Sequence, residues 1–171
     1  RQDQQVKLRG QRIELAEIEF NMQKHLPADT QLAVEVIKPS GGGEQTLVAF
    51  LVEQKKNGMR RLDGNVFGSF TTKFQAALKA MTKQLAIDLP GYMVPSAYIP
   101  LWKMPLLVSC KTDRKRLREI GTSVTRQDLR RFNSVISEKK EPTTEMELKL
   151  RSLWGKLLGG EEDFSANDNF F

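Results

Sequence analysis

Residues 70–85 are the most regularly patterned segment of the sequence and constrain the fold most strongly. Their apolar side chains recur at helical spacing, at Phe70, Phe74, Ala77, Leu78, Met81 and Leu85. Such a stripe lies along one face of a helix and predicts that this face packs against a core. Pro90 and Gly91 follow, so we expect the helix to end before them.

Other segments have the spacing of strands. Residues 32–36 alternate apolar and polar side chains, as in a half-buried strand, whereas the apolar run at 47–52 favours a strand covered on both faces. The glycines at 41–43 lie in the turn between them, so the two strands are expected to form a hairpin. Residues 97–102 predict another strand, in which Pro100 requires an edge position or a bulge.

The N-terminal part changes period within a few residues. Residues 4–9 alternate weakly and predict a short strand, after which Gly10 allows a tight turn. Residues 14–26 then follow helical spacing, and Pro27 is expected to stop that helix. Residues 55–69 are predicted to form a basic surface loop.

Two more helices are expected further along the chain. Asp113 is placed to cap a short basic helix over 114–120, which Gly121 would close. Residues 122–141 are polar, with a weak amphipathic helix in their middle. A capping box, Thr144-x-x-Glu147, then precedes the apolar stripe of a helix over 144–158.

Together these elements predict an α+β fold in three parts. Residues 1–121 are expected to form a small subdomain with an N-terminal two-stranded hairpin and a mixed sheet of about three strands packed by helices. Residues 122–138 are expected to be a linker. The amphipathic helix within 139–171 cannot bury its stripe alone, so it predicts a second domain or docking on the first.

The charge is unevenly distributed. The chain has 27 Lys and Arg against 21 Asp and Glu, a net charge of +6. Residues 138–171 carry eight acids and five bases, whereas 111–131 carry eight bases and three acids. The basic cluster is compatible with binding nucleic acid, phosphate or an acidic partner, and equally with a solvated helix face. Few aromatic residues accompany it, so recognition of bases by stacking is disfavoured.

Several classes of protein and site are disfavoured by what the sequence lacks. It has no apolar run long enough for a membrane helix and no visible signal peptide, and it does not begin with Met, so we expect an internal fragment. His25 is the only histidine and Cys110 the only cysteine, so a zinc site or a Cys–His nucleophile is disfavoured. A lone cysteine makes the cytoplasm the expected compartment.

Three stretches resemble motifs of one enzyme family. They are RQDQQVKLRGQRIELAEIE at 1–19, LPGYMVP at 89–95 and KTDR at 111–114. In this order they are similar to the GRxDxQVKIRGxRIELGEIE, LPxYMVP and NGKxDR motifs of adenylation domains in non-ribosomal peptide synthetases. The resemblance covers residues 1–121 as the small C-terminal subdomain of such a domain. Residues from 139 onward resemble the start of a peptidyl carrier domain and stop before its phosphopantetheine serine.

The resemblance implies a two-step reaction. An amino-acid carboxylate attacks the α-phosphate of ATP, which carries Mg²⁺, to give aminoacyl-AMP and pyrophosphate. The phosphopantetheine thiol of a carrier domain then takes the acyl group as a thioester. ATP and Mg²⁺ would be bound mainly by the large N-terminal adenylation subdomain, which this chain lacks. The implied partners are that subdomain, the carrier domain and the amino acid, with neither nucleic acid nor membrane, and the fragment is not expected to be active alone.

The resemblance also implies roles for individual residues. Lys111 would be the mobile lysine that contacts the α-phosphate and the carboxylate. Asp3 would be the hinge about which the subdomain rotates between the two steps. Arg1 would lie near the ribose and Arg12 near the phosphates of the nucleotide, and the turn at Gly10 would line the path of the pantetheine arm.

One position near this lysine departs from the family, and two alternatives stay open. Cys110 stands where the family usually has Gly, and its Cβ restricts positive φ, which would shift the lysine loop. A stand-alone ligase that activates acyl or aryl acids is one alternative, disfavoured by the carrier-like tail. A basic nucleic-acid-binding module using residues 111–131 is the other.

Overall fold

The computed structural model describes residues 5–40, 44–54 and 66–134, together with Thr144, Met146 and Lys149. It divides the chain into two compact units, Arg1–Ile136 and Ser137–Phe171. The strands and helices between Gln5 and Ser134 all belong to the first unit. The predicted tip at 41–43, most of the predicted basic loop and nearly all of the predicted helix over 144–158 lie outside the described residues.

The N-terminal segment forms the expected hairpin. Strand β1 (Gln5–Leu8) pairs antiparallel with strand β2 (Gln11–Glu14), with Val6 opposite Ile13. Arg9 and Gly10 make the turn with φ values of 49° and 80°, and the second of these is a conformation that glycine adopts without steric penalty. Helix α1 (Leu15–His25) follows directly and ends before Pro27, as predicted.

The central sheet has three strands in the order β3-β4-β5. Strand β3 (Gln31–Ile37) is antiparallel to β4 (Thr46–Val52), and β5 (Ala97–Pro100) runs parallel to β4. The backbone at Pro100 faces away from β4, because its carbonyl oxygen accepts the Gly68 N–H at 2.9 Å. The proline therefore removes no hydrogen bond between β4 and β5, and its predicted edge position is confirmed.

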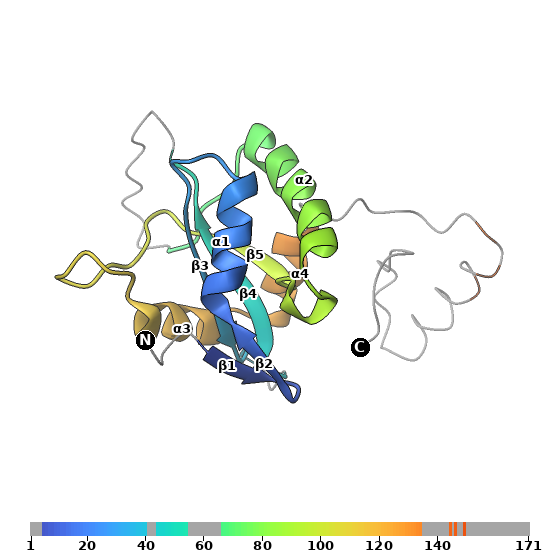
Figure 1. Ribbon diagram of the computed structural model, residues 1–171, viewed down its shortest axis with the longest axis horizontal. Coiled ribbons are helices and arrows are strands. Elements are labelled where there is room, and N and C mark those ends of the chain that lie inside the picture. The colour runs from blue at the N-terminus through green and yellow to red at the C-terminus, as the bar shows by residue number, and fades with distance from the viewer. Residues whose placement is uncertain are drawn as a thin grey trace. The chain divides into compact units, whose positions relative to one another are not determined.

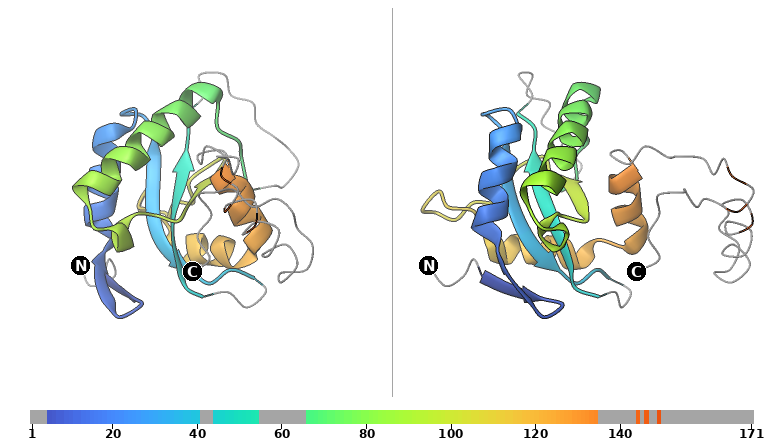
Figure 2. Two further views of the ribbon diagram at one scale, coloured as in Figure 1. Left: turned by 90° about the vertical axis from the view of Figure 1, so that its right-hand side faces the viewer. Right: turned by 45° about the vertical axis from the view of Figure 1, so that its right-hand side comes forward.

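Helices cover both faces of this sheet (Figure 1). Helices α1 and α2 (Thr72–Asp88) share one apolar core with the hairpin, and α2 presents Phe74, Leu78, Met81 and Leu85 to it, as its spacing predicted. Helices α3 (Arg114–Ser123) and α4 (Arg126–Ser134) lie on the opposite face, as the turned views in Figure 2 show. The predicted α+β class is confirmed.

Strand β3 differs from its sequence pattern. Alternation over 32–36 predicted a half-buried strand, which is wrong because the sheet is covered on both faces. Val34 faces the core of α1 and α2, whereas Ala33 and Ile37 face the core of α3. Glu35 lies between Ala33 and Ile37 in the strand and is only 1% exposed, so a carboxylate is buried on this face of the sheet.

The end of α3 is a second correction. Gly121 was expected to close this helix, but the helix continues to Ser123 and Gly121 lies buried within it. The glycine allows close packing, because a Cβ there would lie 2.3 Å from Ile37 Cγ2. The prediction took a packing glycine for a helix terminator.

The segment expected as a linker carries a packed helix. Helix α4 is amphipathic, as its spacing indicated, and Leu129 and Phe132 pack on the core beside α3. Thr125 and Asp128 cap it reciprocally, with backbone-to-side-chain distances of 3.0 and 3.1 Å. The boundaries 1–121, 122–138 and 139–171 stay a prediction.

Candidate functional site

Lys111 lies in a short hairpin that joins β5 to α3. Leu106 and Thr112 form an antiparallel bridge at its base, and the Leu107 N–H donates to the Lys111 carbonyl at 2.8 Å. The Asp113 N–H closes the base by donating to the Pro105 carbonyl at 2.9 Å. We call residues 105–113 the lysine hairpin. Figure 1 shows it in yellow, projecting from the sheet and helices.

The tip of the lysine hairpin is open to solvent. Lys111 itself is exposed, and Val108 is exposed to the full extent of its reference value (106%). Leu106 and Leu107 are about half exposed, at 47% and 49%. The lysine ammonium therefore stands on a hydrogen-bonded base, and none of the described elements packs over the tip, an arrangement that presents a cation to a charged ligand.

Cys110 adopts the backbone conformation that glycine would favour. Its φ is 59°, and its N–H donates to the Leu107 carbonyl at 2.9 Å, which makes a tight turn followed by a left-handed residue. A hairpin of this form usually places Gly at the left-handed position. The thiol is exposed and not in a disulfide. The hairpin thus closes in spite of the Cβ, and the strain is confined to the residue before Lys111.

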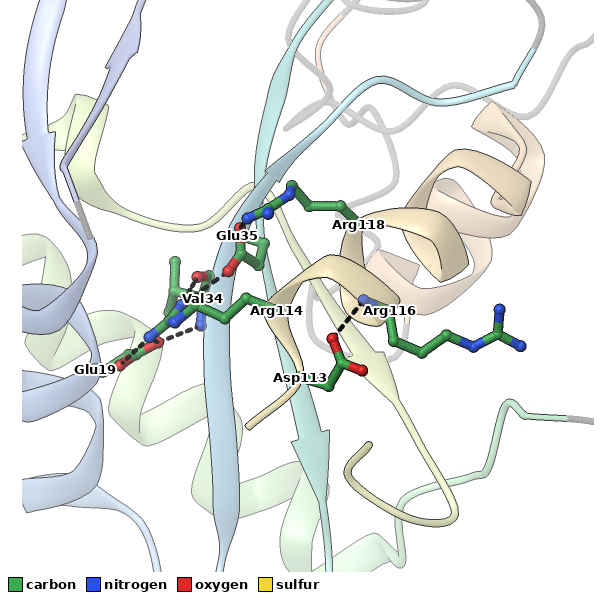
Figure 3. A network of polar contacts seen from close by, with 7 residues as sticks. All are labelled: Glu19, Val34, Glu35, Asp113, Arg114, Arg116 and Arg118. Atoms are coloured by element: carbon green, nitrogen blue, oxygen red, sulfur yellow. Dashed lines mark hydrogen bonds and ion pairs between the residues drawn. The ribbon is translucent and has the colours of Figure 1, made fainter. Parts of the chain in front are cut away.

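The start of α3 fixes the other end of the lysine hairpin. The Asp113 side chain accepts the Arg116 N–H at 3.0 Å, which caps the helix as the sequence predicted. The next residue, Arg114, begins the helix and points back toward the sheet (Figure 3). Its guanidinium lies among atoms of α1 and β3.

Arg114 is the centre of a polar network that the sequence analysis missed. It donates to Glu35 Oε1 at 2.8 Å, to Glu19 Oε1 at 2.9 Å and to the Val34 carbonyl at 3.0 Å. Arg118 Nη1 reaches the other oxygen of Glu35 at 3.2 Å. Glu19 and Arg114 each belong to a stretch that resembles a family motif, but nothing in the sequence pairs them with each other or with Glu35.

The two carboxylates of this network stabilise the charged form of Arg114. Burial acts to lower the pKa of Arg114, but the hydrogen bond to Glu35 and the charge of Glu19 outweigh it, so that the pKa is raised. The Arg114 side chain is 17% exposed and that of Glu35 only 2%. A buried carboxylate left without its partner would be strongly destabilising, so the network is expected to hold as a unit.

Two of the other predicted site residues, Arg12 and Gly10, belong to the hairpin of β1 and β2. Arg12 is exposed and its Nε donates to the Gln5 side chain at 3.0 Å, while Gln5 in turn donates to Glu14. Gly10 sits at the turn, and among the described residues, its chain neighbours aside, no atom lies within 4 Å of the position that a Cβ would take. Arg1 and Asp3 lie outside the described residues, so the structure gives no contact that unites the predicted set.

The described segments show neither a cluster of metal-ligating side chains nor a helix suited to span a membrane. Among the side chains there, no group of three or more His, Cys, Asp or Glu could hold a metal ion. None of the helices found in those segments has the length and apolar character that a membrane span requires.

Comparison with known proteins decides the family. No protein-family model matches the chain. The nonribosomal peptide synthetase 6 of Alternaria brassicicola is 96% identical to it over 171 residues, a match that takes in 100% of the chain and 12% of the relative. The crystal structure of a four-domain nonribosomal peptide synthetase bound to AMP and glycine is 31% identical, with a TM-score of 0.51, over 99% of this chain and 10% of that one.

The chain is a segment of a nonribosomal peptide synthetase. A crystal structure of an anthranilate CoA ligase in complex with anthranoyl-AMP also matches, with a TM-score of 0.52 at 20% identity, over 71% of the chain and 20% of the ligase. At that identity the likeness concerns the fold alone. The synthetase segment thus includes part of an adenylation domain, which has the fold of the C-terminal region of AMP-forming ligases.

Proposed function

We propose that this synthetase segment serves an enzyme that activates an amino acid as aminoacyl-AMP and transfers it to a carrier-bound phosphopantetheine thiol. The observation that carries the proposal is the 31% identical synthetase, whose crystal structure holds AMP and glycine, a nucleotide and an amino acid. That match extends over 99% of the chain, whereas the match to the CoA ligase covers 71%. This difference favours a synthetase module over a stand-alone ligase.

In this proposal Lys111 acts on the first step. A carboxylate oxygen of the amino acid attacks the α-phosphorus of ATP, and the bond from that phosphorus to the leaving pyrophosphate breaks. Negative charge builds on the phosphate oxygens during this transfer, and a positioned cation stabilises it. The exposed Lys111 on its hydrogen-bonded hairpin supplies such a cation. A flexible ammonium on a projecting hairpin also suits a group that enters and leaves a site.

The hairpin β1–β2 is proposed to act in the second step. The open space beside Gly10 would let an extended thiol arm pass close to the backbone. Arg12 would reach the nucleotide phosphates by leaving its contact with Gln5. Arg1 is proposed to lie near the ribose and Asp3 to be the hinge. None of the described residues is assigned to Mg²⁺.

The proposal includes the division of the chain. Residues 1–121 would be the C-terminal subdomain of the adenylation domain and 122–138 the linker, although α4 belongs to the first unit and packs on its core. Residues 139–171 would begin a carrier domain. The large adenylation subdomain and the remainder of the carrier are then the partners of this segment.

The test uses the complete synthetase, loaded with phosphopantetheine, in two assays. ATP–pyrophosphate exchange across a panel of amino acids reports the first step, and retention of labelled amino acid on the protein reports the second. We expect one or a few amino acids to support both. Exchange driven only by aryl or acyl acids, with release of a free coenzyme A thioester, would overturn the proposal.

The hinge has a separate test. Replacing Asp3 with Pro restricts the backbone where rotation is proposed. Carrier loading should then slow more than pyrophosphate exchange. Equal losses in the two assays would contradict a hinge at this residue.

A further inference from the structure

The outer edge of strand β3 is covered by two charged side chains where another strand could have paired. Glu19 Oε1 accepts the Val34 N–H at 2.8 Å, and Arg114 Nη1 donates to the Val34 carbonyl at 3.0 Å. The same side chains bind each other, with Arg114 Nη2 2.9 and 3.1 Å from the two oxygens of Glu19. Helices α1 and α3 are thereby tied to a single residue of the sheet edge (Figure 3).

This arrangement depends on the shape of a guanidinium. Arg114 donates to acceptors on three residues at once, Glu19, Val34 and Glu35, and they surround its planar fork. A lysine ammonium carries its donors on one nitrogen and cannot reproduce this geometry. The contacts therefore require the direction of the arginine side chain as well as its charge. By fixing this direction they also fix the first turn of α3.

The first turn of α3 is also the foundation of the lysine hairpin. Asp113 caps the helix with its side chain and closes the hairpin with its backbone N–H. Arg114 follows it directly and lies three positions after Lys111. The hairpin tip is exposed, so the described contacts that orient it come from this base.

We infer that Arg114 is a positioning residue for Lys111. By holding the first turn of α3 against Glu19, Val34 and Glu35, it sets the direction in which the lysine hairpin leaves the sheet. The inference rests on the proposed role of Lys111 in adenylation. It assigns no contact between Arg114 and the substrate, because the guanidinium points into the unit and its side chain is 17% exposed.

The test compares variants of the complete synthetase in pyrophosphate exchange. Arg114→Ala should lower kcat roughly 10-fold and leave KM for ATP and for the amino acid within about 2-fold, because positioning affects the reaction more than binding. Arg114→Lys should recover only part of the rate. Arg116→Ala is the matched control, since Arg116 is exposed on the same helix and pairs with Glu119.

A double variant separates positioning from general damage. If Arg114 acts through Lys111, the Lys111→Ala, Arg114→Ala enzyme should be about as slow as Lys111→Ala alone, because residues that act as a unit are not additive. Losses that multiply in the double variant would contradict the inference. If Arg114→Ala keeps the parent rate while Lys111→Ala is slow, the inference about Arg114 is wrong but the proposed role of Lys111 stands. If Lys111→Ala keeps the parent rate, both are wrong.

A milder variant keeps the test usable if Arg114→Ala fails to fold. Glu19→Gln retains an oxygen for the Val34 N–H but removes the charge that holds Arg114. We expect a loss of roughly 3-fold in kcat, again absent in the Lys111→Ala background. Glu17→Gln, an exposed change on the same helix, is its control. A folded Glu19→Gln enzyme with the rate of its control would contradict the inference.

Discussion

Gly121 of α3 packs directly on Ile37 of β3. A Cβ added to the glycine would lie 2.3 Å from Ile37 Cγ2 and 2.9 Å from its Cβ, closer than side-chain atoms approach one another. The helix backbone therefore rests against a strand side chain that is only 2% exposed. This close approach places α3, and the lysine hairpin that precedes it, at a defined height above the sheet.

Substituting Gly121 with Ala should destabilise the chain. The added methyl group must displace Ile37 or the helix, and overpacking of this kind costs about 1–3 kcal/mol. That loss should exceed the gain of roughly 1 kcal/mol that Ala brings to a helix interior. Urea denaturation of the chain and its variant measures the difference in the free energy of unfolding.

Two further variants identify the cause. Gly91→Ala is the control, because no atom of the described residues beyond its chain neighbours lies within 4 Å of the added Cβ, and it should change the free energy of unfolding by less than about 0.5 kcal/mol. Ile37→Ala makes room for the methyl group, so Gly121→Ala should be better tolerated in that background. Equal effects of Gly121→Ala in both backgrounds would show that the contact with Ile37 is not responsible.

Substitutions at Cys110 should follow the left-handed backbone there. At φ 59°, Gly is unstrained, whereas a β-branched side chain is the least favourable choice. Cys110→Val should therefore be less stable than Cys110→Gly by about 1–2 kcal/mol. Denaturation of the two variants compares them directly, and Cys110→Ala controls for loss of the thiol. A Val variant as stable as the Gly variant would contradict the left-handed conformation.

The hydroxyl of Tyr98 should make stability fall at alkaline pH. Burial raises the pKa of Tyr98 from its ordinary value of 10.0 to about 12. A hydrogen bond from Thr82, at 3.1 Å, opposes this rise and is outweighed by it. Between these two values the folded protein keeps a proton that the unfolded chain has lost. The free energy of unfolding should therefore decline as pH rises from 10 toward 12, by up to about 3 kcal/mol from this group.

Tyr98→Phe isolates that contribution. At neutral pH the variant should lose about 0.5–1.5 kcal/mol with the hydrogen bond to Thr82. Its stability should then decline less steeply than that of the parent above pH 10. Tyr92→Phe, at a side chain that is 48% exposed, is the matched control. Parallel stability curves for parent and Tyr98→Phe in this range would contradict the buried, neutral hydroxyl.

Much of the fold could be predicted from local patterns. Helical spacing in 70–85 located α2, and proline marked the end of α1 and the edge position in β5. Asp113 was identified as a cap because a cap depends on residues close in sequence. Lys111 was singled out through the resemblance of KTDR at 111–114 to a family motif, which local spacing alone would not have shown.

What escaped prediction depends on residues far apart in the chain. The second face of β3 is covered by α3, which lies about eighty positions later in the chain. Arg114, the partner of Glu35, belongs to the same distant helix. A glycine near the end of a helical pattern looks the same in the sequence whether it ends the helix or packs against a strand. For Gly121, only the contact with Ile37 distinguishes these cases. The positive φ of Cys110 likewise follows from closure of the hairpin around it.

The most direct measurement of the central claim is ATP–pyrophosphate exchange by the complete synthetase with Lys111→Ala. Removing one group that stabilises charge in the transition state should slow exchange roughly 10²–10³-fold. Lys115→Ala, at an exposed lysine in the next helix, should exchange at the parent rate. If both variants exchange at the parent rate, Lys111 is not the lysine of the adenylation reaction.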